Sequence, residues 1–163
     1  MGGSSLALKL AVTGALPRFA TRASEPVRIG FLAPLSGPVQ SWGLPGLCGC
    51  RIWTDWINAA GGMLIDGRRH KVELVEYDCG YDPVRAATGA RVLVQDHGVA
   101  FLLMLGGDTF LPVQDYLRDR KILTTTLLPS DLSPDTPYLI APSEIHHFTM
   151  SLRSIGWRRS API

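Results

Sequence analysis

The residues of this sequence that could take part in catalysis are few and poorly placed for it. Asp78 and Asp82 follow an expected strand, where a catalytic carboxylate could lie, but Asp82 precedes Pro83 and is better explained as a helix N-cap. His146 and His147 are adjacent, so they form a poor metal-binding pair. No nucleophile, base and orienting group can be assembled. The sequence therefore favours a binding protein over an enzyme, with no cofactor and no metal.

Motifs for nucleotide binding and hydrolysis are absent from the sequence. No G-x-G-x-x-G follows the first expected strand, and neither G-x-x-x-x-G-K-[ST] nor G-x-S-x-G occurs. The cysteines, Cys48, Cys50 and Cys79, include no C-x-x-C pair, which argues against a zinc site. We expect buried free thiols, and a disulfide to Cys79 remains the alternative.

Three loops that follow expected strands carry the binding candidates. The loop Leu35 to Gly43 contains Trp42, which is either a wall for an apolar ligand or a core residue. The loop Gly106 to Thr109 offers backbone N–H groups at a helix N-terminus, which suits an anion such as a carboxylate. The loop Leu127 to Ser130 adds a hydroxyl and carbonyl groups. Because ligands bind at the carboxyl ends of strands in open α/β sheets, we expect these loops to form a half-site for a small polar molecule.

The elements that position these loops alternate between strands and helices. Apolar or alternating runs predict strands at 27–33, 71–77, 99–105, 122–126 and 138–140. Helical spacing predicts three helices, which begin at Pro45, at Pro83 and near Phe110. The first is expected to bury Leu47, Cys50, Trp53, Ile57 and Ala60. This order predicts an α/β fold with a parallel, doubly wound, flavodoxin-like sheet and helices on both faces.

Composition limits the class of protein. The 163 residues are 46% hydrophobic and 18% charged with a net charge of +2, which indicates one globular domain and no nucleic-acid partner. No apolar run reaches the roughly 18 residues that a membrane-spanning helix needs, so we expect no direct membrane span.

The two ends of the chain differ from its middle. Residues 1–24 have the pattern of a degenerate export signal, with an apolar run from Leu6 to Leu16 and a Thr-x-Ala cleavage site at Thr21, although a mis-assigned start codon would give the same pattern. Residues 151–163 begin with helical spacing and then lose it. We therefore expect a ligand-binding lobe over 25–150, followed by an irregular tail that an out-of-frame ending would explain.

Three stretches of the chain carry a resemblance to a known family: IGFLAPLSGPVQSWG, INAAGGMLIDGRRHKVELVEYDCGYDP and VAFLLMLGGDTFLPV. With them, the chain from about Val27 to Met150 resembles the N-terminal lobe of the periplasmic branched-chain amino-acid-binding proteins, the solute receptors of ABC importers. The resemblance implies a type I periplasmic-binding fold, in which two similar lobes close on a ligand. It further implies a periplasmic location, a membrane permease of an ABC importer as partner, and a truncated chain that has the first lobe only.

The resemblance also assigns roles to single residues. Trp42 matches an aromatic residue that flanks the ligand, and Gly107 matches a serine whose N–H and hydroxyl hold the α-carboxylate. Leu128 matches a residue whose carbonyl accepts a hydrogen bond from the α-ammonium group. Ser130 matches a threonine that binds the carboxylate.

The loop that contains Gly106, Gly107 and Asp108, all expected ligand-binding residues, departs from the family pattern. Gly107 lacks the serine hydroxyl. An ionised Asp108 beside a bound carboxylate would cost on the order of several kcal/mol in a closed cleft of low dielectric constant. Either Asp108 turns away as the N-cap of its own helix, which we expect, or the ligand is a neutral amide, urea or a cation.

These observations leave three functions to compare. We expect a solute-binding lobe of an ABC importer for branched-chain or other amino acids, incomplete and weak because half a clamp leaves its ligand solvated on one side. The alternative is an amide- or urea-binding receptor, or a sensory or regulatory lobe of the same fold. A flavodoxin-like enzyme domain would need a phosphate-binding loop that the sequence lacks.

Overall fold

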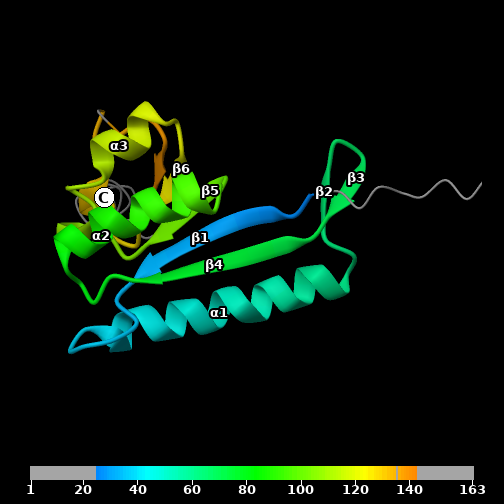
Figure 1. Ribbon diagram of the computed structural model, residues 1–163, viewed down its shortest axis with the longest axis horizontal. Helices are drawn as coiled ribbons and strands as arrows, with labels where there is room; N and C mark the ends of the chain where they lie inside the picture. Colours follow the sequence, from blue (N-terminus) through cyan, green and yellow to red (C-terminus); the bar gives the residue numbers. More distant parts are fainter. Residues whose placement is uncertain (1–24, 135, 143–163) are drawn as a thin grey trace, which may run out of the picture.

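A parallel five-stranded sheet forms the centre of the computed structural model, which describes residues 25–134 and 136–142 (Figure 1). Its strand order is β4-β1-β5-β6-β7, and every pair of neighbours is parallel. The strands are β1 (Val27–Ala33), β4 (Val72–Asp78), β5 (Phe101–Met104), β6 (Leu123–Thr125) and β7 (Leu139–Ile140). The predicted α/β fold with a parallel doubly wound sheet is therefore confirmed. The expected export segment, the tail, residues 143–150 and the histidine pair lie outside the described residues.

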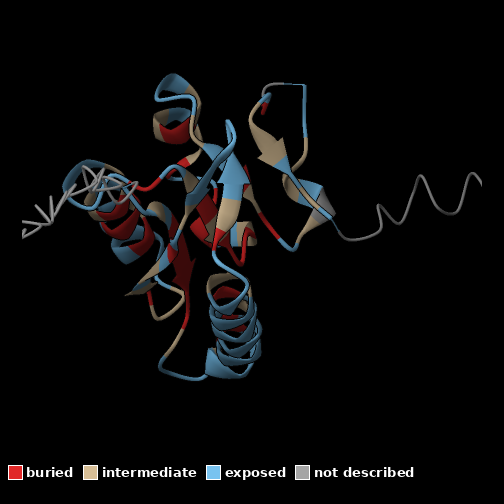
Figure 2. Cartoon of the chain, turned by 90° about the vertical axis from the view of Figure 1, so that its right-hand side faces the viewer, coloured by how far each residue is buried: buried red, intermediate tan, exposed pale blue. Residues whose placement is uncertain are grey.

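Helices pack on both faces of this sheet. Alternate residues of β1 point to opposite faces, so Leu32 packs with α2 (Pro83–Arg91), the π-helix η1 (Val92–Asp96) and α3 (Gln114–Asp119) in the larger core cluster. Phe31 and Ala33 pack instead with Leu47 of α1 (Gln40–Ala59) in a smaller cluster. In Figure 2, α1 is mostly exposed, in agreement with this uneven division of the core.

Helix α1 begins five residues earlier than the sequence predicts. Gln40 is its first residue, and Pro45 lies inside it. The turn at Gly37 starts the helix, since the Gln40 N–H donates to the Gly37 carbonyl (3.3 Å). Pro45 has no N–H and so gives up one hydrogen bond of the helix, a loss that tertiary packing outweighs here.

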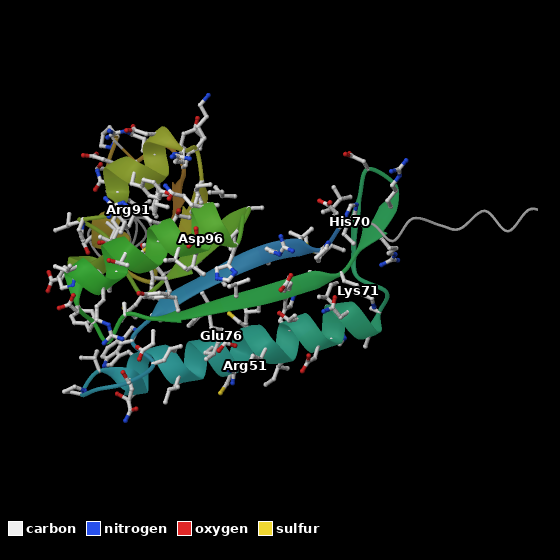
Figure 3. All side chains as sticks on the ribbon, viewed as in Figure 1. Arg51, His70, Lys71, Glu76, Arg91 and Asp96 are labelled. Atoms are coloured by element: carbon white, nitrogen blue, oxygen red, sulfur yellow. The ribbon has the colours of Figure 1, made fainter. Side chains whose placement is uncertain are left out.

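The predicted buried face of α1 is right for Leu47, right in part for two residues and wrong for the other two. Gly43, Leu47 and Thr54 are buried, Cys50 and Ile57 are half-buried, and Trp53 and Ala60 are exposed. The helix lies against β4, to which two polar contacts fasten it. The Asn58 side chain donates a hydrogen bond to the Val72 carbonyl and accepts one from the Val72 N–H, both at 2.8 Å. Arg51 forms an ion pair with Glu76 at 2.6 Å, and Figure 3 shows these two side chains between the helix and the strand.

Other differences from the predicted elements have local causes. The predicted third helix is split into a 3-10 helix η2 (Gly107–Thr109) and α3, because Pro112 between them has no N–H to donate. A hairpin of β2 (Met63–Ile65) and β3 (Arg68–His70) was not predicted, although its Asp66-Gly67 turn was. Of the cysteines, all free, only Cys79 is buried, so the prediction of burial is wrong for the exposed Cys48.

The predicted start of α2 is confirmed in detail. Asp82 is the N-cap, and its carboxylate accepts a hydrogen bond from the Arg85 N–H at 2.7 Å. Pro83 occupies the first turn, where its missing N–H costs nothing. Asp82 therefore has the structural role that the sequence favoured over a catalytic one.

Candidate functional site

Three loops meet at the carboxyl edge of the sheet, around Gly107. A Cβ atom built on Gly107 would lie 3.0 Å from Leu128 Cδ1 and 3.2 Å from the Tyr81 hydroxyl oxygen. Leu128 follows β6 and Tyr81 follows β4, while Gly107 follows β5. The structure thus brings the predicted residues Gly107 and Leu128 together and adds Tyr81 to them.

Gly106 allows this convergence because only glycine fits its position. Its φ is +97°, and a Cβ there would overlap the Asp131 carboxylate and lie 2.9 Å from Thr126 Cβ. Asp131 belongs to the 3-10 helix η3 (Pro129–Asp131), which follows β6. The absence of a side chain at Gly106 lets the loop after β6 close onto the loop after β5.

The Gly107 N–H is already bonded to a carboxylate of the protein. It donates to both Asp131 oxygens, at 3.1 and 3.3 Å. The predicted helix N-terminus is also only the three-residue η2, too short to present a full set of free N–H groups. The prediction of bare backbone N–H groups for an anion is therefore wrong at Gly107, where an internal anion occupies the donor.

Asp108 is exposed at this edge and does not cap a helix. Gly106 is the N-cap of η2, with no side-chain cap, and α3 begins after Val113 with none either. Among the described residues, Asp108 has no hydrogen bond or ion pair. The expected N-cap role is wrong, and the exposed carboxylate of Asp108 follows directly after Gly107, whose N–H is bonded to Asp131.

The loop after β6 contributes Leu128 and Ser130 in different ways. The Leu128 carbonyl accepts hydrogen bonds from the Thr126 hydroxyl (3.3 Å) and from the Asp131 N–H (3.1 Å), so both of its lone pairs have partners. Ser130 lies in η3 and is exposed at the edge. A ligand ammonium group would share or replace the Thr126 bond at Leu128.

Trp42 lies in the first turn of α1 and not in a loop. It is 65% exposed, so the interpretation as a core residue is wrong. Its side chain lines an apolar groove of about 230 Å³ between α1 and the sheet, together with Leu105 and Leu127. These neighbours adjoin Gly106 and Leu128 in the chain, so the groove that Trp42 lines extends to the loops that carry the other candidates.

Asp78 organises the loop that precedes α1. Its Oδ1 accepts hydrogen bonds from the N–H groups of Leu35 (2.8 Å), Ser36 (3.3 Å) and Gly80 (2.8 Å), and Oδ2 accepts from the Ser36 hydroxyl. Partial burial by itself raises the pKa of Asp78, but these hydrogen bonds outweigh burial and lower it. Its acceptor positions are filled, so the geometry gives Asp78 a structural role.

Sequence reasoning missed Tyr81 and Asp131. Tyr81 has a φ of +63°, unusual for a residue with a side chain, and it directly precedes the N-cap of α2. Its position shortly after β4 could have indicated that it lies at the carboxyl edge of the sheet. Asp131 lies one residue beyond the predicted loop Leu127 to Ser130, and only the structure reveals that it turns back to Gly107.

The described part of the chain has neither a candidate metal site nor a helix suited to a membrane. No group of three or more His, Cys, Asp or Glu side chains there could hold a metal ion. Within the same residues, no helix has both the length and the apolar character to cross a membrane.

In a doubly wound parallel sheet, ligands bind at the carboxyl ends of the strands, which is the edge where these loops meet. The family described as periplasmic binding protein matches residues 26–157, and the chain belongs to this family. It is a family of solute-binding proteins and not of enzymes, which confirms the resemblance.

Individual relatives agree with this assignment. The chain is 33% identical over 118 residues to the Leu/Ile/Val-binding protein BraC3 of Rhizobium johnstonii, a match over 72% of this chain and 30% of that protein. It is 28% identical to the Leu/Ile/Val-binding protein of Escherichia coli K12, over 69% of this chain and 29% of that protein. The matched region thus spans about 30% of the length of these relatives.

Solved structures confirm the fold. An ABC transporter substrate-binding protein from Sphaerobacter thermophilus is 29% identical with a TM-score of 0.57, over 71% of this chain and 32% of that one. The substrate-binding protein LivJ of Streptococcus pneumoniae, solved with isoleucine, is 24% identical with a TM-score of 0.63, over 72% of this chain and 34% of that one.

Proposed function

We propose that this chain is a solute-binding lobe that serves an ABC importer for branched-chain or other amino acids, in the periplasm and with a membrane permease as partner. The observation that carries the proposal is the meeting of the loops after β4, β5 and β6 at Gly107, in a chain whose relatives are named Leu/Ile/Val-binding proteins. The edge supplies polar groups, and the exposed Trp42 indole supplies an apolar surface close to them.

In this proposal each candidate residue contacts one part of an amino acid. The Ser130 hydroxyl and the Gly106 backbone face the polar groups, beside Gly107, whose N–H is held by Asp131. Leu128 offers its carbonyl, and Trp42 packs on the side chain. Asp108 lies at the rim. These residues cover one side of the ligand, and tight binding would need contacts on its other side as well.

Thermal unfolding tests the proposal, because a ligand that binds only the folded chain raises its stability. At a leucine concentration ten times the dissociation constant, the gain is about 1.4 kcal/mol, or about 4 °C in Tm. Glycine at equal concentration is the control, since it has the same charged groups and no side chain. An increase in Tm with leucine that does not exceed the increase with glycine would contradict the proposal.

A second candidate function is the binding of an amide or urea, and the position of Asp131 favours it. Its carboxylate occupies the Gly107 N–H, and Asp108 adds a second negative charge at the same edge. A ligand carboxylate would meet both charges, whereas the N–H groups of an amide would find acceptors in them.

The Asp131→Asn variant tests which candidate is right. Isovaleramide and isovalerate share one alkyl group and differ at the amide or carboxylate. If Asp131 selects against anions, the original chain binds the amide about tenfold more tightly, a difference of about 1.4 kcal/mol, and the substitution removes the preference.

The control for this experiment is Asp96→Asn, which removes the same charge from the end of η1, before β5 begins and thus away from the carboxyl edge (Figure 3). It is expected to leave the preference unchanged. Equal binding of isovalerate and isovaleramide by the original chain, measured by ligand-observed NMR, would eliminate the amide candidate.

A further inference from the structure

Tyr81 brings a hydroxyl group to the carboxyl edge of the sheet, on the turn between β4 and α2 (Figure 1). Its hydroxyl oxygen would lie 3.2 Å from a Cβ atom at Gly107, so the phenol uses space that a side chain there would fill. Tyr81 is half-buried, and within the described ranges, 25–134 and 136–142, its hydroxyl has no hydrogen-bond partner. The group therefore stands at the candidate site with its hydrogen-bonding capacity unused.

The backbone of the turn that carries Tyr81 is fixed on both sides. The Gly80 N–H donates to the Asp78 carboxylate at 2.8 Å, and the Asp82 N–H donates to the Cys79 carbonyl at 2.9 Å. Tyr81 itself has a φ of +63°, in the left-handed region that is unfavourable for a residue with a side chain. Residues held in that region occur preferentially at functional sites. Because its backbone is held in place before a ligand arrives, the phenol loses little freedom when it binds one.

Other donors at this edge already have acceptors within the chain. The Gly107 N–H donates to Asp131, at 3.1 and 3.3 Å. The hydroxyl groups of Thr109 and Thr126 donate to backbone carbonyls, at 2.9 and 3.3 Å. A carboxylate has room for about four hydrogen bonds, so Asp131 can still accept from a ligand N–H. A ligand oxygen at this edge needs a donor instead, and Tyr81 supplies one.

We propose that Tyr81 recognises an oxygen atom of the ligand: its hydroxyl donates a hydrogen bond to a carboxylate or amide oxygen bound beside Gly107. This role rests on the proposed function, because it takes the carboxyl edge as the ligand site. It adds an orientation, in which the ligand oxygen faces the turn after β4 and the ligand N–H groups face Asp131 and the Leu128 carbonyl. Leu128 Cδ1 lies 3.0 Å from the same Cβ position at Gly107, and a hydrogen bond beside an apolar group is stronger than one in water.

Tyr81→Phe tests this role, because it removes the hydroxyl and keeps the ring. Leucine and isovaleramide both carry the oxygen atom, whereas isopentylamine has the alkyl chain and the nitrogen of isovaleramide without it. Where the original chain binds them, we expect the variant to bind leucine about tenfold and isovaleramide about fivefold more weakly, since a charged acceptor makes the stronger hydrogen bond. The affinity for isopentylamine is expected to change less than twofold. Residue-resolved NMR titrations of the full 163-residue chain give the dissociation constants.

Tyr138→Phe is the matched control. Tyr138 is half-buried like Tyr81, but it directly precedes β7 and so lies at the amino edge of the sheet. This variant is expected to leave all affinities unchanged. Thermal unfolding of both variants shows whether the fold is kept, and Tyr81→Phe is expected to retain the original Tm because the lost hydroxyl has no partner within the described chain.

Two results would overturn the role of Tyr81 and leave the proposed function standing. One is saturable binding of leucine or isovaleramide that Tyr81→Phe does not weaken. The other is an equal weakening of isovaleramide and isopentylamine, which would show a change in the shape of the site and not the loss of a hydrogen bond to oxygen. If the original chain binds neither leucine nor isovaleramide, the proposed function itself is contradicted, and the role of Tyr81 with it.

Discussion

Replacement of Asp78 by alanine is expected to lower the free energy of unfolding by about 2–4 kcal/mol. The carboxylate accepts hydrogen bonds from three backbone N–H groups and the Ser36 hydroxyl. Its removal leaves them without this acceptor, among them the partly buried N–H groups of Leu35 and Gly80. The loop that it fastens connects β1 to α1, so the start of α1 should loosen as well. Urea unfolding followed by circular dichroism measures the change.

Asp78→Asn is the matched control, because an amide oxygen can still accept from the N–H groups of Leu35, Ser36 and Gly80. A loss of about 1 kcal/mol is expected, since the charge and the acceptor of the Ser36 hydroxyl are removed and the three backbone hydrogen bonds are kept. If alanine and asparagine have equal effects, the hydrogen bonds are not what stabilises the loop.

The lowered pKa of Asp78 also predicts a pH dependence. A carboxyl whose pKa is lower in the folded chain stabilises the fold above its ordinary value of 3.8, and this contribution is lost as the pH falls through the lower folded value. The original chain should therefore lose more stability on acidification below about pH 4 than Asp78→Ala does. Parallel acid dependence in the two proteins would contradict this account.

Gly43→Ala is expected to cost about 3 kcal/mol or more. A Cβ at this position would overlap the backbone carbonyl oxygen of Pro34 and lie 3.4 Å from Ala33 Cβ, so α1 and the end of β1 would have to move apart. Because the overlap is with backbone, no side-chain rotation relieves it. Thermal or urea unfolding of the variant measures the loss.

Gly49→Ala is the control in the same helix. A Cβ there meets nothing within 4 Å, and alanine favours a helix over glycine by about 1 kcal/mol, so this variant should be more stable than the original chain. If Gly43→Ala were as stable as Gly49→Ala, the close approach of α1 to Pro34 would be wrong.

The strands and the start of α2 were predictable because their signals are local. Apolar runs with β-branched residues mark β1 and β5, and Asp82-Pro83 marks a helix start that needs no tertiary contact. The start of α1 was not predictable in this way. Pro45 indicates a helix that starts at that residue, whereas α1 starts at Gln40. The added first turn contains Gly43, whose backbone packs against Pro34, a contact that no local pattern predicts.

The sequence predicted which loops after β5 and β6 meet, but not which of their chemical groups are already bonded within the chain. Topology alone placed Gly107 and Leu128 at one edge, since carboxyl ends of parallel strands lie together. The bond from Gly107 to Asp131 joins residues 24 positions apart and depends on the φ of Gly106, which no local pattern reveals. For the same reason, Asp108 was assigned a cap that the three-residue η2 does not use.

The measurement that tests the central claim most directly is a residue-resolved NMR titration of the ¹⁵N-labelled chain with leucine and with isovaleramide. We expect one of them to give saturable shifts of the backbone amides of Gly106, Gly107, Leu128 and Ser130 and of the Trp42 indole. The β2-β3 hairpin should not respond, since it follows α1 at the amino edge of the sheet. Saturable shifts confined to that hairpin, or no saturable shift at the carboxyl edge with either ligand, would contradict a solute-binding site there.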